Sequence, residues 1–252
     1  MATKKKRILY IDPVGEKPLV QAAIKEHLNR YAAEDYAAIE VTHLDKAPPV
    51  LEYYYYLALI APKLLHRIKQ AELDGFDAAI IGCFCDPALD AAKEICENMV
   101  VVGVMEASVH IASFLASRFS ILAAQQKSVQ DFRDNLIKYG LKDKLASFRS
   151  LGISAAELMK DSNETAERMR KEIRLAIDED GAEAVILGCT LQLGHFQELQ
   201  KEFGIPVIDA PLAALKTAES LISLRDDFGW YTSKICSYLT PSKEELASWG
   251  SE

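Results

Sequence analysis

The sequence contains no apolar run long enough to cross a lipid bilayer, and it has no excess of basic charge. It has 29 Lys and Arg against 37 Asp and Glu, a formal net charge of -8. Nucleic acids and anionic membranes require a basic surface, so the charge argues against both as partners. The basic residues at the start precede only a short apolar stretch, 8–11, which does not resemble an export signal. We therefore expect a cytoplasmic protein whose basic start is a solvated arm.

Cysteine is scarce and odd in number, with five residues in the chain. Without an export signal, this pattern favours reduced thiols in a cytoplasm over a disulfide framework. Cys83 and Cys85 form a close pair, but no second pair has metal-site spacing, so no metal is expected. The side chains of this pair would diverge in an extended segment, and we interpret Cys85 as a packing residue. Cys96 and Cys236 lie in predicted helices and are also interpreted as packing residues.

The sequence does contain a short stretch that occurs twice. Residues 77–83 read DAAIIGC and residues 183–189 read EAVILGC. Each copy is an acid, a short apolar run, then Gly-Cys, which is typical of a strand in a parallel sheet covered on both faces. Another apolar stretch precedes each copy at a similar distance, at 7–12 and at 119–124. We infer a duplicated α/β unit.

Strand and helix patterns alternate along the whole chain, without a linker or a low-complexity segment. Strands are expected at 8–11, 38–44, 78–82, 100–104, 120–124, 148–151, 184–188 and 207–208. Helices are expected at 18–31, 52–73 (with a kink or restart at Pro62), 88–96, 106–116, 128–139, 165–178, 196–203 and 211–224, with a mostly helical tail to 251. This alternation predicts parallel sheets with right-handed crossovers.

The predicted fold class is therefore α/β. We expect two pseudo-twofold-related domains, each a four-stranded parallel sheet flanked by helices, with the active site in the interdomain cleft. Residues 1–113 and 215–252 would form the first domain, to which the C-terminal helices return. Residues 114–214 would form the second domain.

Each copy of the repeat ends in a thiol, Cys83 or Cys189, at the carboxyl end of a strand, where open parallel sheets collect their chemistry. A thiol just before a helix N-terminus has a lowered pKa, and Asp86-Pro87 is typical of a helix start three residues after Cys83. Two thiols across a cleft can take a proton from one face of a carbon and return one to the other. Such inversion needs no cofactor. The alternative, two buried packing thiols, is disfavoured by their equivalent positions.

Two longer motifs resemble a known family. Residues 82–92 (GCFCDPALDAA), followed by 101–107 (VVGVMEA), resemble the aspartate/glutamate/hydantoin racemase superfamily. The hydantoin-racemase branch, which includes allantoin racemases, is the most similar. Residues 187–190 (LGCT) and 205–209 (IPVID) resemble the second half of that family, so the resemblance covers essentially the whole chain.

This resemblance implies a cofactor-independent enzyme in which Cys83 and Cys189 are the acid–base pair. It also implies a small-molecule substrate and is compatible with a homo-oligomer. Two departures bear on the substrate. Residues 12–15 read DPVG where the branch has an Asn-Pro-Asn-Ser/Thr-like turn, and 123–124 are alanines where relatives often carry Thr. Because hydroxyls there hold a substrate anion in carboxylate-binding members, free aspartate or glutamate is a poor match. A neutral ring such as a 5-substituted hydantoin fits better.

Six further residues are candidate substrate-binding residues: Asp12, Pro13, Tyr56, Phe84, Glu106 and Thr190. Asp12 could orient a thiol or accept a ring N–H, or simply form a turn before Pro. The N–H groups of Phe84 and Thr190 could bind a developing enolate oxygen. Tyr56 could line the pocket or pack in the core. Glu106 could lie near the cleft or cap the following helix.

Three other functions remain open at this point. A decarboxylase of the arylmalonate type or a cis-trans isomerase of the maleate type could use the same scaffold with one thiol as proton donor or nucleophile. Cysteine at both positions favours a racemase over a decarboxylase, although maleate isomerases can also carry two. The third possibility is a non-catalytic protein that binds a small ligand.

Overall fold

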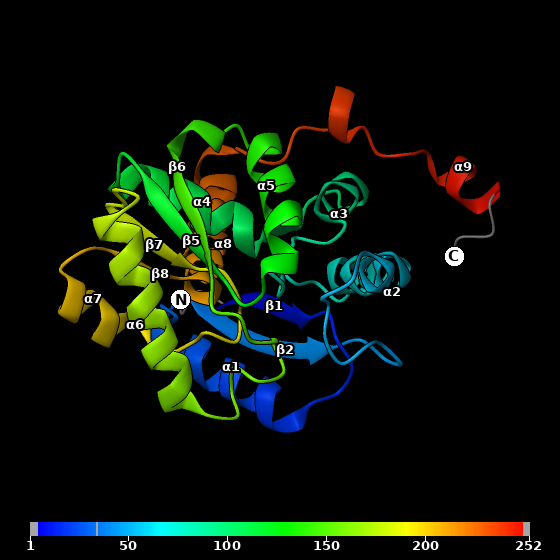
Figure 1. The fold of residues 1–252 in the computed structure, drawn as a ribbon. Helices are drawn as coiled ribbons and strands as arrows, with labels where there is room; N and C mark the ends of the chain where they lie inside the picture. The colour runs from blue at the N-terminus through cyan, green and yellow to red at the C-terminus, as the bar shows by residue number, and fades with distance from the viewer. Residues whose placement is uncertain (1–4, 34, 249–252) are drawn as a thin grey trace.

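The computed structural model describes residues 5–33 and 35–248, and within them it contains two four-stranded parallel sheets flanked by helices (Figure 1). The strand orders are β2-β1-β3-β4 and β6-β5-β7-β8. The two orders are the same once four is added to each strand number, as the repeat in the sequence predicts. The α/β fold class is confirmed.

The first sheet and its helices come from the first half of the chain: β1 (Lys6–Asp12), α1 (Pro18–Tyr31), β2 (Ala37–His43), α2 (Tyr54–Leu73), β3 (Ala78–Ile81), α3 (Leu89–Ile95), β4 (Val100–Gly103) and α4 (Val104–Leu115). The second half supplies β5 (Phe119–Ala123), α5 (Val129–Lys138), β6 (Leu145–Ser150), α6 (Ser162–Asp178), β7 (Ala184–Leu187), α7 (Phe196–Phe203), β8 (Val207–Asp209), α8 (Ala210–Phe228) and α9 (Lys243–Ser248). Three 3₁₀ turns lie at Gln126–Ser128, Lys142–Lys144 and Cys236–Tyr238.

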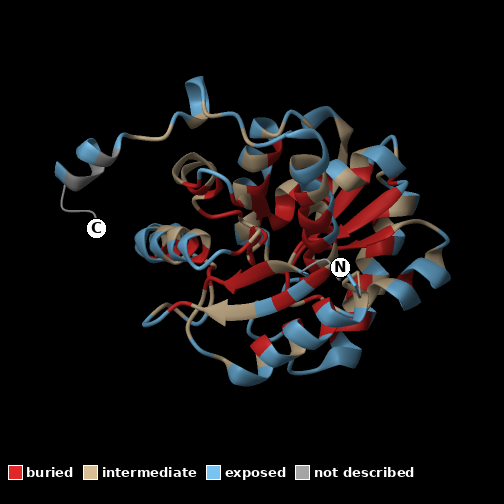
Figure 2. Cartoon of the chain, turned by 180° about the vertical axis from the view of Figure 1, so that it is seen from behind, coloured by how far each residue is buried: buried red, intermediate tan, exposed pale blue. Residues whose placement is uncertain are grey.

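The central strands are apolar on both faces because both faces are covered. In β1, Ile8 and Tyr10 face a core shared with the second sheet, whereas Leu9 and Ile11 face the helices α2 and α3. Figure 2 shows the central strands as largely buried, whereas the edge strands β2 and β6 are mostly intermediate or exposed. Successive strand residues point to opposite faces, so a strand covered on both sides reads as a continuous apolar run.

One hydrophobic core joins the two halves. It contains Ile8 and Ile80 of the first sheet, Ile121 and Ile186 of the second, and side chains of α1, α4, α5 and α8. The last long helix, α8, packs on α4, β3 and β4, which belong to the first half. The chain therefore returns to the first sheet after the second is complete. The domain boundaries at 113/114 and 214/215 stay predictions.

The prediction of a mostly helical tail is wrong over the described residues. Gly229, at φ +69°, ends α8, and only Cys236–Tyr238 and α9 are helical beyond it. Lys234 donates to the carbonyls of Lys93 and Glu94, and the Thr240 hydroxyl donates to the carbonyl of Glu94. These bonds to the end of α3 hold the tail as an irregular segment, and α9 projects from the body (Figure 1). Residues 249–251 of that prediction lie outside the described residues.

One smaller difference concerns helix α2. α2 runs through Pro62 as one continuous helix, rather than restarting there. No helix in the part of the chain that the structure describes is long and apolar enough to cross a bilayer.

Candidate active site

A cavity of about 80 Å³ lies at the carboxyl ends of the four central strands, β1, β3, β5 and β7. Each strand contributes the residues where it ends or just beyond its last residue: Asp12 and Pro13, Gly82 to Cys85, Ala124 and Gln125, and Gly188 to Leu191. β1 and β3 are neighbours whose connections run to opposite edges of the sheet, as are β5 and β7. Such a switch point is where open α/β sheets bind ligands. The cavity thus takes one wall from each half.

Cys83 and Cys189 occupy equivalent backbone positions on this cavity. Each follows a glycine whose N–H donates to the neighbouring strand, Gly82 to Ile11 at 2.8 Å and Gly188 to Leu122 at 2.9 Å. Each cysteine then begins a four-residue turn. Its carbonyl accepts an N–H from the residue three positions later, at 3.0 Å in both halves. The structure therefore brings the two predicted thiols to one cavity, from opposite halves of the molecule.

The surroundings of Cys189 oppose its ionisation, contrary to the prediction of a lowered pKa. Burial raises the pKa of the Cys189 thiol to about 12, and negative charge at Cys83 adds to the rise. The N–H of Leu191 donates to the sulfur and acts in the opposite direction. The residue is only partly buried because its sulfur borders the cavity, yet protein atoms surround it closely. Cys189 is therefore a thiol, and so a proton donor, near neutral pH.

The expected helix start next to Cys83 is also wrong. Helix α3 begins at Leu89, and Asp86 does not cap it. The Asp86 carboxylate instead accepts the N–H groups of Met105 and Glu106, at 3.0 and 2.8 Å, and so caps α4. Asp86 has a φ of +46°, a left-handed conformation that Asp adopts more readily than most residues. The polar cap of α4 thus fixes the turn that carries Cys83.

Asp12 lies at the end of β1 and lines the cavity, where only 6% of its surface is exposed. Its Oδ2 accepts a hydrogen bond of 2.8 Å from the Gln21 side chain. Burial raises the pKa of Asp12 to about 6, and the Gln21 bond limits the rise. Gln21 is a polar residue on the buried face of α1, and its nearly complete burial gives it a role that the sequence did not indicate.

Three other predicted binding residues line the cavity. Pro13 follows Asp12 at its wall, and Phe84 packs edge-to-face on Phe132 with ring centroids 4.9 Å apart. The Thr190 hydroxyl donates to the carbonyl of Gly82 at 3.4 Å, which joins the two cysteine turns across the halves. The roles of these residues in binding stay predictions, but their positions border the space between the thiols.

Tyr56 and Glu106 are not among the residues that line this cavity. Tyr56 packs against the core between the first sheet and α2, and its ring contacts Tyr53 at 5.0 Å. Glu106 forms an ion pair with Lys93, with both oxygens within 2.7 Å of Nζ. The pair joins α3 to the start of α4 and borders a different hollow from the one that the thiols line. The placement of these two residues gives no support to a substrate-binding role for either.

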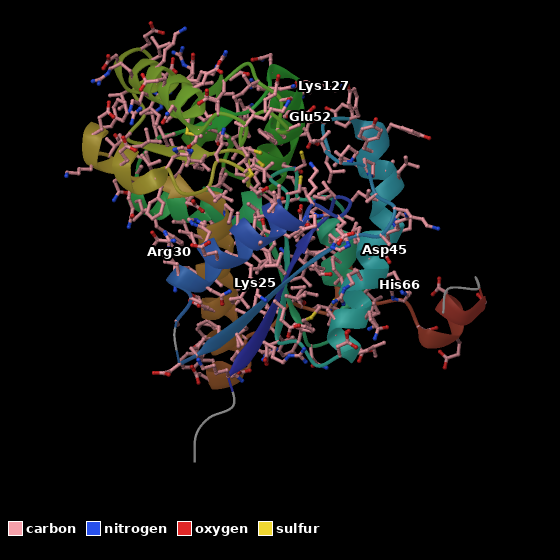
Figure 3. The ribbon with its side chains drawn as sticks, turned by 90° about the horizontal axis from the view of Figure 1, so that it is seen from below. Lys25, Arg30, Asp45, Glu52, His66 and Lys127 are labelled. Atoms are coloured by element: carbon pink, nitrogen blue, oxygen red, sulfur yellow. The ribbon has the colours of Figure 1, made fainter. Side chains whose placement is uncertain are left out.

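Two loops that the sequence did not single out complete the cavity. Pro49 to Glu52 of the first half and Ala155 of the second line it, and the Glu52 carboxylate accepts the N–H of Ala155 at 2.7 Å. Glu52 and Lys127 come from different halves and lie at the same end of the molecule, where they border a second, smaller cavity (Figure 3). These residues are more than seventy positions apart in the sequence, so no local sequence pattern predicts that they lie together.

Metal chemistry has no support from clustered ligands. Among the described residues, no group of three or more His, Cys, Asp or Glu is placed to hold a metal ion. The polar groups at the cavity are instead thiols, carboxylates, amides and backbone N–H groups.

Comparison with known proteins agrees with this geometry. Residues 19–218 match the Asp/Glu/Hydantoin racemase family. The chain is 34% identical over 220 residues to a hydantoin racemase of Pseudomonas sp. (strain NS671), covering 87% of this chain and 86% of that protein. It is 33% identical over 244 residues to a hydantoin racemase of Paenarthrobacter aurescens, covering 95% and 99%.

A solved structure of the allantoin racemase from Klebsiella pneumoniae has a TM-score of 0.86 to this chain at 30% identity, with 95% of each chain covered. The fold and the cavity define an α/β enzyme with paired thiols at its strand ends. The chain belongs to the Asp/Glu/hydantoin racemase family, and it is a racemase, an isomerase.

Proposed function

We propose that this racemase inverts a carbon next to a carbonyl by moving protons between Cys83, Cys189 and the substrate, without a cofactor, and that the substrate is a 5-substituted hydantoin. One observation carries the mechanism. The two thiols end equivalent strands, begin equivalent turns and line one cavity from opposite halves. Groups on opposite sides of a bound carbon are the requirement for inversion.

The direction of proton transfer is based on the surroundings of Cys189. Burial keeps Cys189 protonated near neutral pH, so it is the acid in the resting enzyme. Cys83, as a thiolate, removes the proton from the facing side of the carbon, and Cys189 delivers its own proton to the opposite side. The products are the inverted carbon, a thiol at Cys83 and a thiolate at Cys189. The reverse direction starts from that second protonation state.

Removing a proton next to a carbonyl moves negative charge to the carbonyl oxygen. The N–H groups of Phe84 and Thr190 lie within the turns that follow each thiol, and both residues border the cavity. No backbone acceptor for either N–H is found among the described residues. Donors fixed in advance stabilise such charge without reorganisation. We assign these two N–H groups to the developing enolate oxygen.

The walls of the cavity support a neutral ring with an apolar substituent. Two relatives are hydantoin racemases, each covered over most of its length. In this chain the cavity wall is mainly apolar and includes Val14, Val20, Leu51, Phe132 and Leu191. Ala124, at the end of β5, offers no hydroxyl to a carboxylate. Asp12 supplies an acceptor for a ring N–H.

A cytoplasmic location and a small-molecule partner are part of this proposal. All five cysteines are free thiols, which is the usual state in a reducing compartment. Self-association into a homo-oligomer, expected from the family resemblance, stays a prediction.

The test is racemisation of L- and D-5-benzylhydantoin, followed by polarimetry, together with deuterium uptake at C5 in D₂O. Cys83→Ala and Cys189→Ala should each lower the racemisation rate by roughly 10²–10⁴-fold, the usual contribution of one proton-transferring group. The matched control is Cys236→Ala, which removes an exposed thiol in the tail and should leave the rate unchanged.

Deuterium uptake separates the alternatives. Two-base inversion predicts that each single variant still exchanges one enantiomer, the one whose proton faces the remaining thiol. If both variants racemise at the wild-type rate, the two-thiol mechanism is wrong. Decarboxylation of a 2-substituted malonate without hydantoin racemisation would instead favour the decarboxylase alternative.

A further inference from the structure

A third cysteine, Cys85, lies close to Cys83 of the proposed catalytic pair. The N–H of Asp86 donates to the carbonyl of Cys83 at 3.0 Å and closes a turn with Phe84 and Cys85 at its corner. The extended segment with diverging side chains, expected from the sequence, is therefore wrong. In the turn, Cys85 interacts electrostatically with Cys83, and both residues line the cavity. Cys189 is on the opposite wall, so Cys85 is the thiol on the same side as Cys83.

Asp131, on helix α5, is the second partner of Cys85. Cys85 and Asp131 line the same small cavity, and the Asp131 carboxylate is the alternative acceptor for the single S–H proton of Cys85. Burial raises the pKa of Asp131, and its Oδ2 has no hydrogen-bond donor among the described residues. Contact with Cys83, burial and the nearby Asp131 raise the pKa of Cys85 well above its ordinary value. Cys85 is thus held as a thiol, beside an acceptor with an oxygen free to take its proton.

Proton transfer between Cys83 and Cys189 requires no third thiol. A thiolate that works as a base on a cavity wall is, however, the form of cysteine that hydroperoxides oxidise. The sulfenic acid so formed is either over-oxidised irreversibly or trapped by a neighbouring thiol as a disulfide. Cys85 is the residue placed to decide between these outcomes, because it shares a tight turn with Cys83 and lines the same cavity.

We propose that Cys83 and Cys85 form an oxidative modification site, in which Cys85 traps hydroperoxide-oxidised Cys83 as an internal disulfide that a thiol reductant reverses. The first step is attack of the Cys83 thiolate on the terminal oxygen of the hydroperoxide. The O–O bond breaks, sulfur is oxidised to a sulfenic acid, and the rest of the peroxide leaves as an alkoxide, which takes up a proton from solvent to give the alcohol.

In the second step, Asp131 accepts the thiol proton of Cys85, and the Cys85 sulfur attacks the sulfur of the sulfenic acid. The S–S bond forms and the S–O bond breaks. The hydroxide that leaves takes the proton from Asp131 and departs as water. In total, two thiols and one hydroperoxide give a disulfide, an alcohol and water. A disulfide requires Cβ atoms about 3.5–4.5 Å apart. The backbone of the turn sets this spacing, and rotation about the Cα–Cβ bonds then brings the two sulfurs together.

The site is tested on the full-length protein with tert-butyl hydroperoxide, followed by alkylation, digestion and mass spectrometry. The peptide that holds Cys83 and Cys85 should lose two hydrogen atoms and both alkylation sites, and dithiothreitol should restore them. This readout needs no activity assay, so it stands or fails independently of the proposed function. Loss of racemisation on oxidation, and its recovery with dithiothreitol, rests on the proposed function.

Variants then test the role of each partner. In Cys85→Ala, Cys83 should progress to sulfinic acid, and dithiothreitol should recover little of that variant's own starting activity. Cys85→Ser provides the same test if the alanine variant does not fold. Asp131→Asn should slow disulfide formation without changing the first oxidation. Cys236→Ala, the matched control, should behave as the wild type. A disulfide between Cys83 and Cys189, absence of any disulfide, or full recovery of Cys85→Ala would overturn the proposal.

Discussion

The Asp86 carboxylate accepts a hydrogen bond of 2.7 Å from the Tyr139 hydroxyl. Asp86 belongs to the turn that begins at Cys83, and Tyr139 ends helix α5 of the other half. The same carboxylate caps α4. One buried side chain therefore ties the turn of the first thiol to a helix of each half.

Tyr139→Phe tests this link. Without the hydroxyl, one oxygen of a buried carboxylate loses a donor, which should lower the free energy of unfolding by about 1–3 kcal/mol. The Tyr139 bond holds the pKa of Asp86 down against burial, which raises it to about 7. The variant should therefore raise that pKa further. Chemical denaturation and an NMR titration of the carboxyl measure the two effects.

The matched control for this variant is Tyr238→Phe, because the Tyr238 hydroxyl bonds to the more exposed Asp90 at 3.3 Å. It should change the unfolding free energy by less than about 0.5 kcal/mol. Equal effects of the two variants would contradict the role given to the Asp86–Tyr139 pair.

The ionisation of Asp12 should make the free energy of unfolding depend on pH. Its pKa in the folded state is about 6, against an ordinary value of 3.8. A carboxyl whose pKa rises on folding stabilises the fold fully below the unfolded pKa, and this contribution is lost as pH rises through the folded pKa. Stability relative to a variant without the ionising group should therefore fall between about pH 4 and pH 6.

Asp12→Asn is the appropriate reference, since an amide oxygen can still accept from Gln21. Its unfolding free energy should match the wild type near pH 4 and exceed it by about 3 kcal/mol at pH 8. Urea denaturation across this range provides the measurement. A constant difference at every pH would mean that the carboxyl of Asp12 is not perturbed by its burial.

Alkylation by iodoacetamide should distinguish Cys189 from an ordinary thiol. Only the thiolate reacts, and burial raises the pKa of Cys189 to about 12. Its rate of modification, followed by peptide mass spectrometry, should still be rising with pH above 9, where the rate for an unperturbed thiol levels off. The exposed Cys236 in the same sample serves as an internal reference. Comparable rates for both at pH 7 would contradict the assignment of Cys189 as the acid.

The sequence predicted well what depends on local pattern. The doubly covered strands β3 and β7 read as short apolar runs, and the Gly-Cys ending placed both thiols at the strand ends. What it missed depends on tertiary contacts. Asp86-Pro87 has the composition of a helix start, yet Asp86 caps a different helix, α4, which the fold brings next to it. The proximity of Cys85 to Cys83 and Asp131 likewise depends on a turn, whereas the sequence predicted an extended conformation for this segment.

The tail shows the same limit. Residues 229–242 are rich in Gly, Pro, Ser, Thr and aromatic residues, which are poor helix formers. Bonds to the end of α3 from Lys234 and Thr240 also hold the segment in another conformation. Tyr56 was predicted to lie near the substrate because it belongs to an aromatic run. Glu106 was predicted to lie there because of its position in the family motif. Neither signal gives the direction in which a helical side chain points, and both residues pack elsewhere.

Gly82 tests how tightly the position of Cys83 is fixed. A Cβ added at Gly82 would lie 2.4 Å from the Tyr10 ring and 2.7 Å from the carbonyl oxygen of Ile11. Both neighbours are fully buried, so neither can move aside cheaply. Gly82→Ala should therefore lower the unfolding free energy by about 1–3 kcal/mol through overpacking.

The same substitution should also displace the turn that begins at Cys83. Misplacing a catalytic group by about 1 Å can lower a rate by roughly 10²-fold, so racemisation should fall more than stability alone explains. Gly140→Ala is a suitable control, because nothing lies within 4 Å of its added Cβ and the cost is limited to its positive φ. If folded Gly82→Ala and folded Gly140→Ala racemise at the same rate, the position of Cys83 is not tightly fixed by the end of β3.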